Sequence, residues 1–279
     1  FEPAKRMFRF SFKILLSNIT NIINNNILNF LLGHYFTARD TGNYYQAYQW
    51  NSKCFSLVQS MVNQVAQPVL IDLQNEGERQ LNAFRKMMRF AAFLSFPLLL
   101  GFGLVAKEFI VLTVGPKWIV SAGYVQILCF AGATMPLITL LSNMVISKGK
   151  SNLYLYCTFG LGIVQIASML LLWPYGIKNM VIAYTLINIL WVFVWLFFVN
   201  RLTGYGLWAF IKDTTPFALA AFAVMTATYF TTAAIHTLWL LLICRIAMAM
   251  LLYYAVMRMA RVQILAECQQ FIIKKIHSR

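Results

Sequence analysis

The sequence predicts an all-α integral membrane protein, and its composition carries that prediction. Of its 279 residues, 60% are hydrophobic and only 11% are charged, whereas soluble domains carry about 25% charged residues. So few charges cannot cover a water-facing surface, which excludes an ordinary soluble domain, a disordered segment and a disulfide-stapled secreted module. Long uncharged stretches recur along the chain, as they do in polytopic helical membrane proteins.

Eight stretches predict membrane-spanning helices, since one crossing needs about 20 mostly apolar residues. They are Ile14–Phe36, Asn43–Ile71, Phe90–Val114, Ile119–Ser147, Asn152–Trp173, Met180–Val199, Thr215–Thr231 and Leu238–Met257. The uncharged stretch from Thr214 to Cys244 is too long for one crossing, so it is divided at the polar residues around His236. The loops between these spans are too short to hold a folded domain, which places any function inside the membrane or in chain outside this sequence.

The distribution of Lys and Arg predicts that both ends of the chain face the cytoplasm. One set of alternate loops holds only Arg39, Lys107, Lys117 and Lys178. The chain ends and the opposite loops hold nearly all the others, and cytoplasmic segments are enriched in these residues. The formal charge of +15 is therefore explained by membrane topology, and no nucleic-acid partner is expected because the basic residues do not share one water-exposed face.

Amide and hydroxyl side chains recur at helical spacing in the first two predicted spans. On one face of the first span the sequence places Asn18, Asn21, Asn25 and Asn29, and along the second it places Gln46, Gln49, Lys53, Ser56, Ser60, Asn63, Gln64 and Gln67. Amides facing lipid would remain unpaired at a cost of several kcal/mol. Single amides are often contacts between helices, worth about 0.6 to 2 kcal/mol each. A stripe along nearly a whole span instead favours a hydrated cavity, and we predict these twelve residues as substrate-binding candidates.

Lys53 is the most specific of the substrate-binding candidates, because it lies about ten residues into the second span. A charge at that depth costs at least a few kcal/mol unless it is hydrated or paired. The acidic residues of this chain all lie in loops, at the ends of the chain or near span ends. Lys53 is thus expected either to pair with an acid in chain outside this sequence or to supply positive charge to an anionic substrate.

Three other charged residues are expected to have structural roles. Arg245 lies about seven residues into the last span among apolar neighbours, and snorkelling towards the outer headgroups is the expected explanation. Adjacent Lys107 and Glu108 lie at the outer end of the third span and are expected to be interfacial anchors.

No enzyme chemistry, cofactor or metal is expected from the sequence. The three histidines are far apart, the cysteines show no C-x-x-C spacing, and no glycine-rich phosphate loop precedes a helix. The tail Val262–Lys275 is basic and amphipathic, which predicts a helix on the inner membrane surface.

Several short motifs resemble those of polysaccharide flippases. They are Gly42-Asn43-Tyr44-Tyr45-Gln46-Ala47-Tyr48, Val65-Ala66-Gln67-Pro68-Val69-Leu70, Arg79-Gln80-Leu81 with Phe84-Arg85-Lys86, Phe96-Pro97-Leu98, Gly115-Pro116-Lys117-Trp118 and Ile146-Ser147-Lys148-Gly149-Lys150-Ser151-Asn152. In their order and spacing the chain is similar, over nearly its whole length, to the Wzx-like, lipopolysaccharide-biosynthesis branch of the multidrug/oligosaccharidyl-lipid/polysaccharide (MOP) exporter superfamily.

The resemblance implies two lobes of six helices each, often with two further helices. Residues 1–212 would form the six-helix second lobe, and 213–279 would form two additional transmembrane helices and the basic amphipathic tail. The chain begins with Phe1, so it is expected to be a fragment whose first lobe is missing. Its expected partners are that lobe, membrane lipids and polysaccharide polymerase machinery.

The resemblance also implies a function: translocation of undecaprenyl-diphosphate-linked oligosaccharide across the bacterial inner membrane by alternating access. Two alternatives stay open. A multidrug exporter of the same superfamily would be expected to place carboxylates deep in its cavity for cationic drugs. A membrane glycan polymerase or glycosyltransferase would need acids or bases in a site, usually on a sizeable outer loop.

Overall fold

The computed structural model describes residues 2–261, 264 and 265, and within them the chain forms helices and turns without a strand. The helices are α1 (Glu2–Tyr35), α2 (Ala38–Asp72), α3 (Gly77–Thr113), α4 (Ile119–Ser147), α5 (Ser151–Leu172), α6 (Ile177–Thr203), α7 (Leu207–Thr231) and α8 (Leu238–Met259). Short 3-10 turns, Pro116–Trp118 and Trp173–Tyr175, precede α4 and α6. The all-α fold predicted from composition is confirmed.

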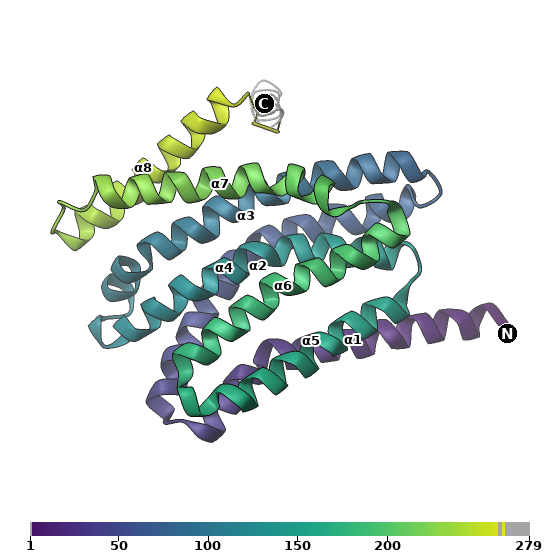
Figure 1. Cartoon of the computed structure of the whole chain (residues 1–279), viewed down its shortest axis with the longest axis horizontal. Helices are drawn as coiled ribbons and strands as arrows, with labels where there is room; N and C mark the ends of the chain where they lie inside the picture. The colour runs from purple at the N-terminus through teal and green to yellow at the C-terminus, as the bar shows by residue number, and fades with distance from the viewer. Residues whose placement is uncertain (1, 262–263, 266–279) are drawn as a thin grey trace, which may run out of the picture.

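The helices run back and forth, and the turns between them alternate between the two ends of the bundle (Figure 1). Helix α4 lies at the centre, packed against α2, α3 and α6. Helices α1 and α5 pack together on one side, while α7 and α8 pack on α3 at the other side (Figure 1). Along much of its length, the face of α2 away from α4 is therefore left without a partner among the described residues.

The predicted count of eight apolar spans was too high. Among the described residues, six helices, α3 to α8, are long and apolar enough to cross a membrane. Helices α1 and α2 have 34 and 35 residues, so their length is ample at about 1.5 Å per residue. They fall short because the asparagines of α1 and the amide stripe of α2 lower their hydropathy.

Three helices begin well before their predicted spans, and the first is α1, which starts at Glu2 and not near Ile14. Helix α3 starts at Gly77 and not near Phe90, and α7 starts at Leu207 and not near Thr215. The predicted boundaries followed apolar composition. In the structure each helix also includes the charged segment that precedes its apolar stretch. This extension places residues predicted to lie in loops on the faces of packed helices. The predicted tail helix falls mostly outside the described residues.

Helices α1 and α5 approach closely at a glycine. Gly162 of α5 faces the side-chain amide of Asn24, and a Cβ at this position would overlap that amide. The approach lets Asn24 Nδ2 donate a hydrogen bond of 2.9 Å to the carbonyl of Thr158. Small residues that admit close helix contact are typical of membrane bundles, and here the contact sets the position of α1.

Candidate functional site

The polar stripe of α2 lies on the face that the bundle leaves uncovered. Lys53, Ser56, Ser60, Asn63, Gln64 and Gln67 are exposed, while Gln46 and Gln49 are half-buried. The opposite face, which includes Ala47, Val58, Val62 and Ala66, is buried and packs on α4. The periodicity read from the sequence therefore describes a real face of the helix. Leu57 and Met61 are also exposed, so an apolar border runs beside the polar residues.

Lys53 has no carboxylate partner among the described residues. Its Nζ lies 4.6 Å from the centroid of the Trp50 ring, and that ring packs edge-on against Phe109. A cation–π contact at an exposed site contributes only about 0.5–1 kcal/mol. The ammonium group is thus held near a fixed aromatic surface while its charge stays uncompensated by this chain.

The stripe residues differ in how firmly the bundle engages them. Asn63 Oδ1 accepts a hydrogen bond of 3.0 Å from Asn143 Nδ2 of α4, so it also serves as a contact between helices. Ser56 and Ser60 donate only to carbonyls of their own helix. Gln46, Gln49, Gln64 and Gln67 make no side-chain hydrogen bond within the described part of the chain. Most of the stripe therefore keeps its hydrogen-bonding capacity for water or a ligand.

The asparagines of α1 divide into two groups. Tyr154 of α5 joins two of them, since Asn21 Nδ2 donates to its hydroxyl at 3.0 Å and that hydroxyl donates to Asn18 Oδ1 at 3.3 Å. Asn25 is exposed, and Asn29 buries both amide atoms without a hydrogen-bond partner among the described residues. Contacts between helices thus account for Asn18 and Asn21 and leave Asn25 and Asn29 unexplained by packing.

Arg245 does not reach out to the headgroups as predicted. It is 7% exposed and its Nη1 lies 2.9 Å from Glu108 Oε1. Its Nε also donates to the hydroxyl of Thr232 at 3.2 Å. Glu108 is 4% exposed and joins α3 to α8, so it is not an interfacial anchor. The sequence did hold a signal: the predicted topology places the end of α3 and the start of α8 on the same side.

A second buried acid escaped the sequence analysis because it was assigned to a loop. Asp213 of α7 is 2% exposed and accepts hydrogen bonds from Arg85 Nε at 2.9 Å and Arg85 Nη2 at 3.2 Å. The hydroxyl of Tyr205 donates to it at 3.2 Å. Burial, followed by the charge of Asp213, raises the pKa of Tyr205, so this hydroxyl remains protonated and able to donate.

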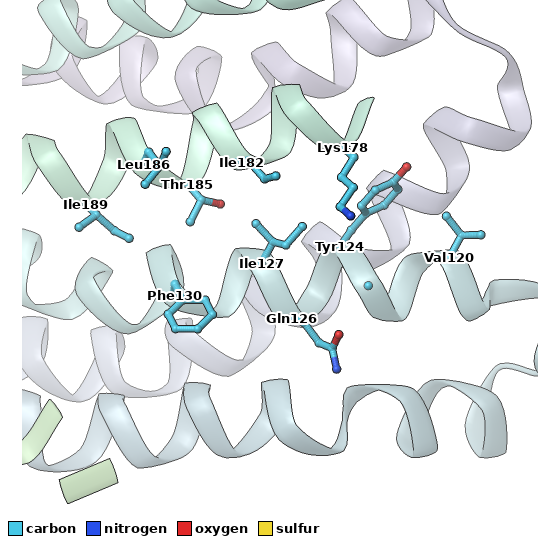
Figure 2. A pocket seen from close by; sticks show the side chains of 11 residues that line it. Val120, Tyr124, Gln126, Ile127, Phe130, Lys178, Ile182, Thr185, Leu186 and Ile189 are labelled. Carbon is cyan, nitrogen blue, oxygen red and sulfur yellow. The ribbon is translucent and has the colours of Figure 1, made fainter. Parts of the chain in front are cut away.

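Neither of the two main cavities among the described residues encloses the stripe. A cavity of about 720 Å³ lies between α4 and α6, with Lys178 and Tyr124 near one end and Thr185 and Ile189 near the other (Figure 2). It contains none of the predicted site residues. An apolar groove of about 480 Å³ runs between α3 and α8, and Cys54 of α2 lies on its wall. The stripe is thus an open surface beside an apolar groove.

Cysteine labelling tests whether the stripe is hydrated. We expect Ser56→Cys, Ser60→Cys and Gln67→Cys in the full-length protein to react with a small water-soluble thiol reagent at least about tenfold faster than Val58→Cys and Val62→Cys. The two valines lie on the same helix but are 3% and 6% exposed, and a buried thiol is inert. Equal protection on both faces would mean that the amides are packed against other protein.

Fold and composition together define an all-α, multi-pass membrane protein. The structure matches the lipid II flippase MurJ in its inward closed conformation with a TM-score of 0.66 and 15% identity, over 91% of this chain and 53% of that one. This likeness establishes the fold: the chain corresponds to about half of a flippase-type bundle.

The sequence is also similar to proteins of polysaccharide biosynthesis. Residues 1–123 match the family model described as Polysaccharide biosynthesis protein. The teichuronic acid biosynthesis protein TuaB of Bacillus subtilis is 28% identical over 207 residues, which cover 74% of this chain and 41% of that protein. The lipopolysaccharide biosynthesis protein WzxC of Escherichia coli is 23% identical over 145 residues, 52% and 30% of the two chains. A membrane protein from the cps region of Klebsiella pneumoniae is 28% identical over 54% of this chain and 31% of its own length.

The chain is therefore similar to Wzx-type membrane proteins of polysaccharide biosynthesis, and it shares its fold with a flippase. The resemblance seen in the sequence motifs is thereby confirmed. The chain spans between 30% and 41% of the length of these relatives.

Proposed function

We propose that the full-length protein moves an undecaprenyl-diphosphate-linked oligosaccharide from the inner to the outer leaflet by alternating access. The observation that carries the proposal is the uncovered face of α2, where Lys53 stands among amides and hydroxyls without an acidic partner in the described chain. Such a polar face is tolerated at membrane depth where it lines a water-filled path or meets other protein. The first lobe of the same protein would face this surface and close that path.

The chemistry of the face suits each part of such a lipid. Amides both donate and accept hydrogen bonds, so Gln49, Gln64 and Gln67 are matched to sugar hydroxyls. The ammonium of Lys53 is a compact charge suited to a diphosphate. The groove beside α3 and α8, with Phe93, Pro97 and Tyr253 on its walls, offers apolar surface to a polyprenyl tail.

The proposal includes an assembly and an orientation. The stripe would face a first lobe of the same protein in the bacterial inner membrane, with polysaccharide polymerase machinery as a further partner. Both ends of the chain would lie in the cytoplasm, as the distribution of Lys and Arg predicts.

Transport is favoured over the alternatives by the charges on the stripe. It carries Lys53 and no carboxylate, which suits an anionic substrate better than the cationic drugs of a multidrug exporter. A polymerase or glycosyltransferase needs a positioned acid or base. The two buried acids of the described chain, Glu108 and Asp213, are instead engaged by arginines.

Reconstitution tests the proposal. We expect vesicles containing the full-length protein to expose a fluorescent lipid-linked oligosaccharide to an outside quencher, while the mass of the glycan stays unchanged. The same vesicles should not accumulate a cationic dye. A change in glycan length would indicate a polymerase or transferase, and dye uptake without lipid movement would indicate a drug exporter. Complementation of a flippase-null strain checks the result in cells.

A further inference from the structure

A pocket at the predicted cytoplasmic end of α3, α7 and α8 combines basic and apolar walls. It has a volume of about 460 Å³, and no residue of the α2 stripe lines it. Its basic lining residues are Lys86 and Arg89 of α3, Lys212 of α7 and Arg261 after α8, and Phe217, Ala220 and Val256 supply apolar surface. These segments are adjacent, since α3 packs against both α7 and α8 (Figure 1).

The described lining of this pocket holds basic side chains and no acid. The nearby carboxylate of Asp213 is engaged by Arg85 at 2.9 Å, by Arg89 at 3.7 Å and by the hydroxyl of Tyr205. Lys212 and Arg261 are exposed and form no ion pair within the described chain. These two side chains are therefore the ones that the described chain leaves open to an anion.

The polar and apolar walls are separated along the membrane normal. Lys212 is near the start of α7, and Arg261 lies two residues beyond Met259, the last residue of α8, in a left-handed backbone conformation (φ 50°). The apolar walls lie deeper: Ala220 is eight residues beyond Lys212, about 12 Å along the helix axis. Basic groups at the interface above an apolar cleft match an anionic headgroup joined to acyl chains, and not a soluble anion.

We infer that this pocket binds an anionic phospholipid of the inner leaflet, with the headgroup phosphate on Lys212 and Arg261 and an acyl chain along Phe217 and Val256. Arg89 adds positive charge at the rim while it holds Asp213. Basic pockets between transmembrane helices at the cytoplasmic side are suited to such headgroups. The site goes beyond the proposed transport of a glycolipid, because no stripe residue lines it and the expected ligand is an ordinary anionic membrane lipid.

Native mass spectrometry of the full-length protein, purified in a mild detergent, tests the site. With added dioleoyl phosphatidylglycerol we expect the protein to retain about tenfold more lipid than with dioleoyl phosphatidylcholine, because two basic side chains face the headgroup. Lys212→Gln combined with Arg261→Gln should remove most of this preference. Lys150→Gln combined with Arg201→Gln removes equal charge from exposed positions at the same end, outside the pocket, and should leave the preference unchanged.

One further variant and one competition experiment complete the test. Ala220→Phe fills the apolar part of the pocket and should weaken retention of phosphatidylglycerol with all charges present, and size-exclusion profiles check that each variant is folded. Retention by the Lys212/Arg261 variant equal to that of the control pair would overturn the site. Displacement of the lipid by millimolar inorganic phosphate would also overturn it, since the pocket would then be a general anion site. Glycolipid movement, measured separately, distinguishes failure of this site from failure of the proposed function.

Discussion

Lys53→Ala is expected to lower export of the lipid-linked glycan by about 10- to 100-fold, the equivalent of one lost hydrogen bond to a charged group. The protein should stay in the membrane at wild-type abundance, because Lys53 is exposed and forms no ion pair within the described chain. The measurement is complementation of a flippase-null strain, with surface glycan read beside the amount of protein in the membrane.

Other substitutions at the same position separate charge from shape. Lys53→Gln should resemble alanine, and Lys53→Arg should keep part of the activity because Arg also binds phosphate, through a wider planar fork. Lys53→Glu should be worst, since it opposes a like charge where water screens poorly. Lys107→Ala is the matched control: Lys107 is an exposed lysine of α3 away from the stripe, and its loss should leave export unchanged.

The competing explanation of Lys53 predicts a different pattern. If it pairs with an acid of the first lobe, Lys53→Ala should reduce membrane abundance, and removal of that acid should restore it. Full export by Lys53→Ala at normal abundance would take the residue out of the mechanism.

Arg245→Met is expected to destabilise the protein by about 3–5 kcal/mol, the usual cost of leaving one charge of a buried pair uncompensated. The uncompensated group would be Glu108, whose second oxygen, Oε2, already lacks a hydrogen-bond partner among the described residues. The loss would also free α8 from α3, because this ion pair joins the two helices. Thermal unfolding of the full-length protein in detergent measures the effect.

A double-mutant cycle identifies the pair as the cause. Arg245→Met combined with Glu108→Leu should recover most of the lost stability, since a buried ion pair replaced by apolar groups of similar size is often neutral. Lys107→Met changes the exposed neighbour of Glu108 and should have little effect. An Arg245→Met protein as stable as wild type would mean that Arg245 reaches the outer headgroups, as the sequence alone had indicated.

Features that depend on local periodicity could be predicted from the sequence. The spacing of Lys53, Ser60 and Gln67 placed them on one helical face, and the structure leaves that face uncovered. The all-α class followed from composition, because 11% charged residues cannot solvate a surface of this size. Helix ends were less predictable. Helix α3 begins at Gly77, because charged residues end an apolar stretch without ending the helix.

Which amides pair, and with what, could not be predicted in the same way. Asn21 meets Tyr154 across 133 positions of sequence, whereas Asn25, four residues further along the same face, stays exposed. The two residues are alike in type and in spacing. Only the packing of α5 on α1 distinguishes them, because it brings Tyr154 within hydrogen-bond distance of Asn21.

The sequence by itself therefore determined that this is a helical membrane protein with a polar face on α2 that includes Lys53, because composition and helical period are properties of single segments. The tertiary structure alone decided that Arg245 binds Glu108 and that Asp213 binds Arg85. Those pairings depend on which helix ends are brought together. An acid near the end of a span is solvated if its helix stands alone, and it becomes a buried partner only when a second helix covers it and excludes water.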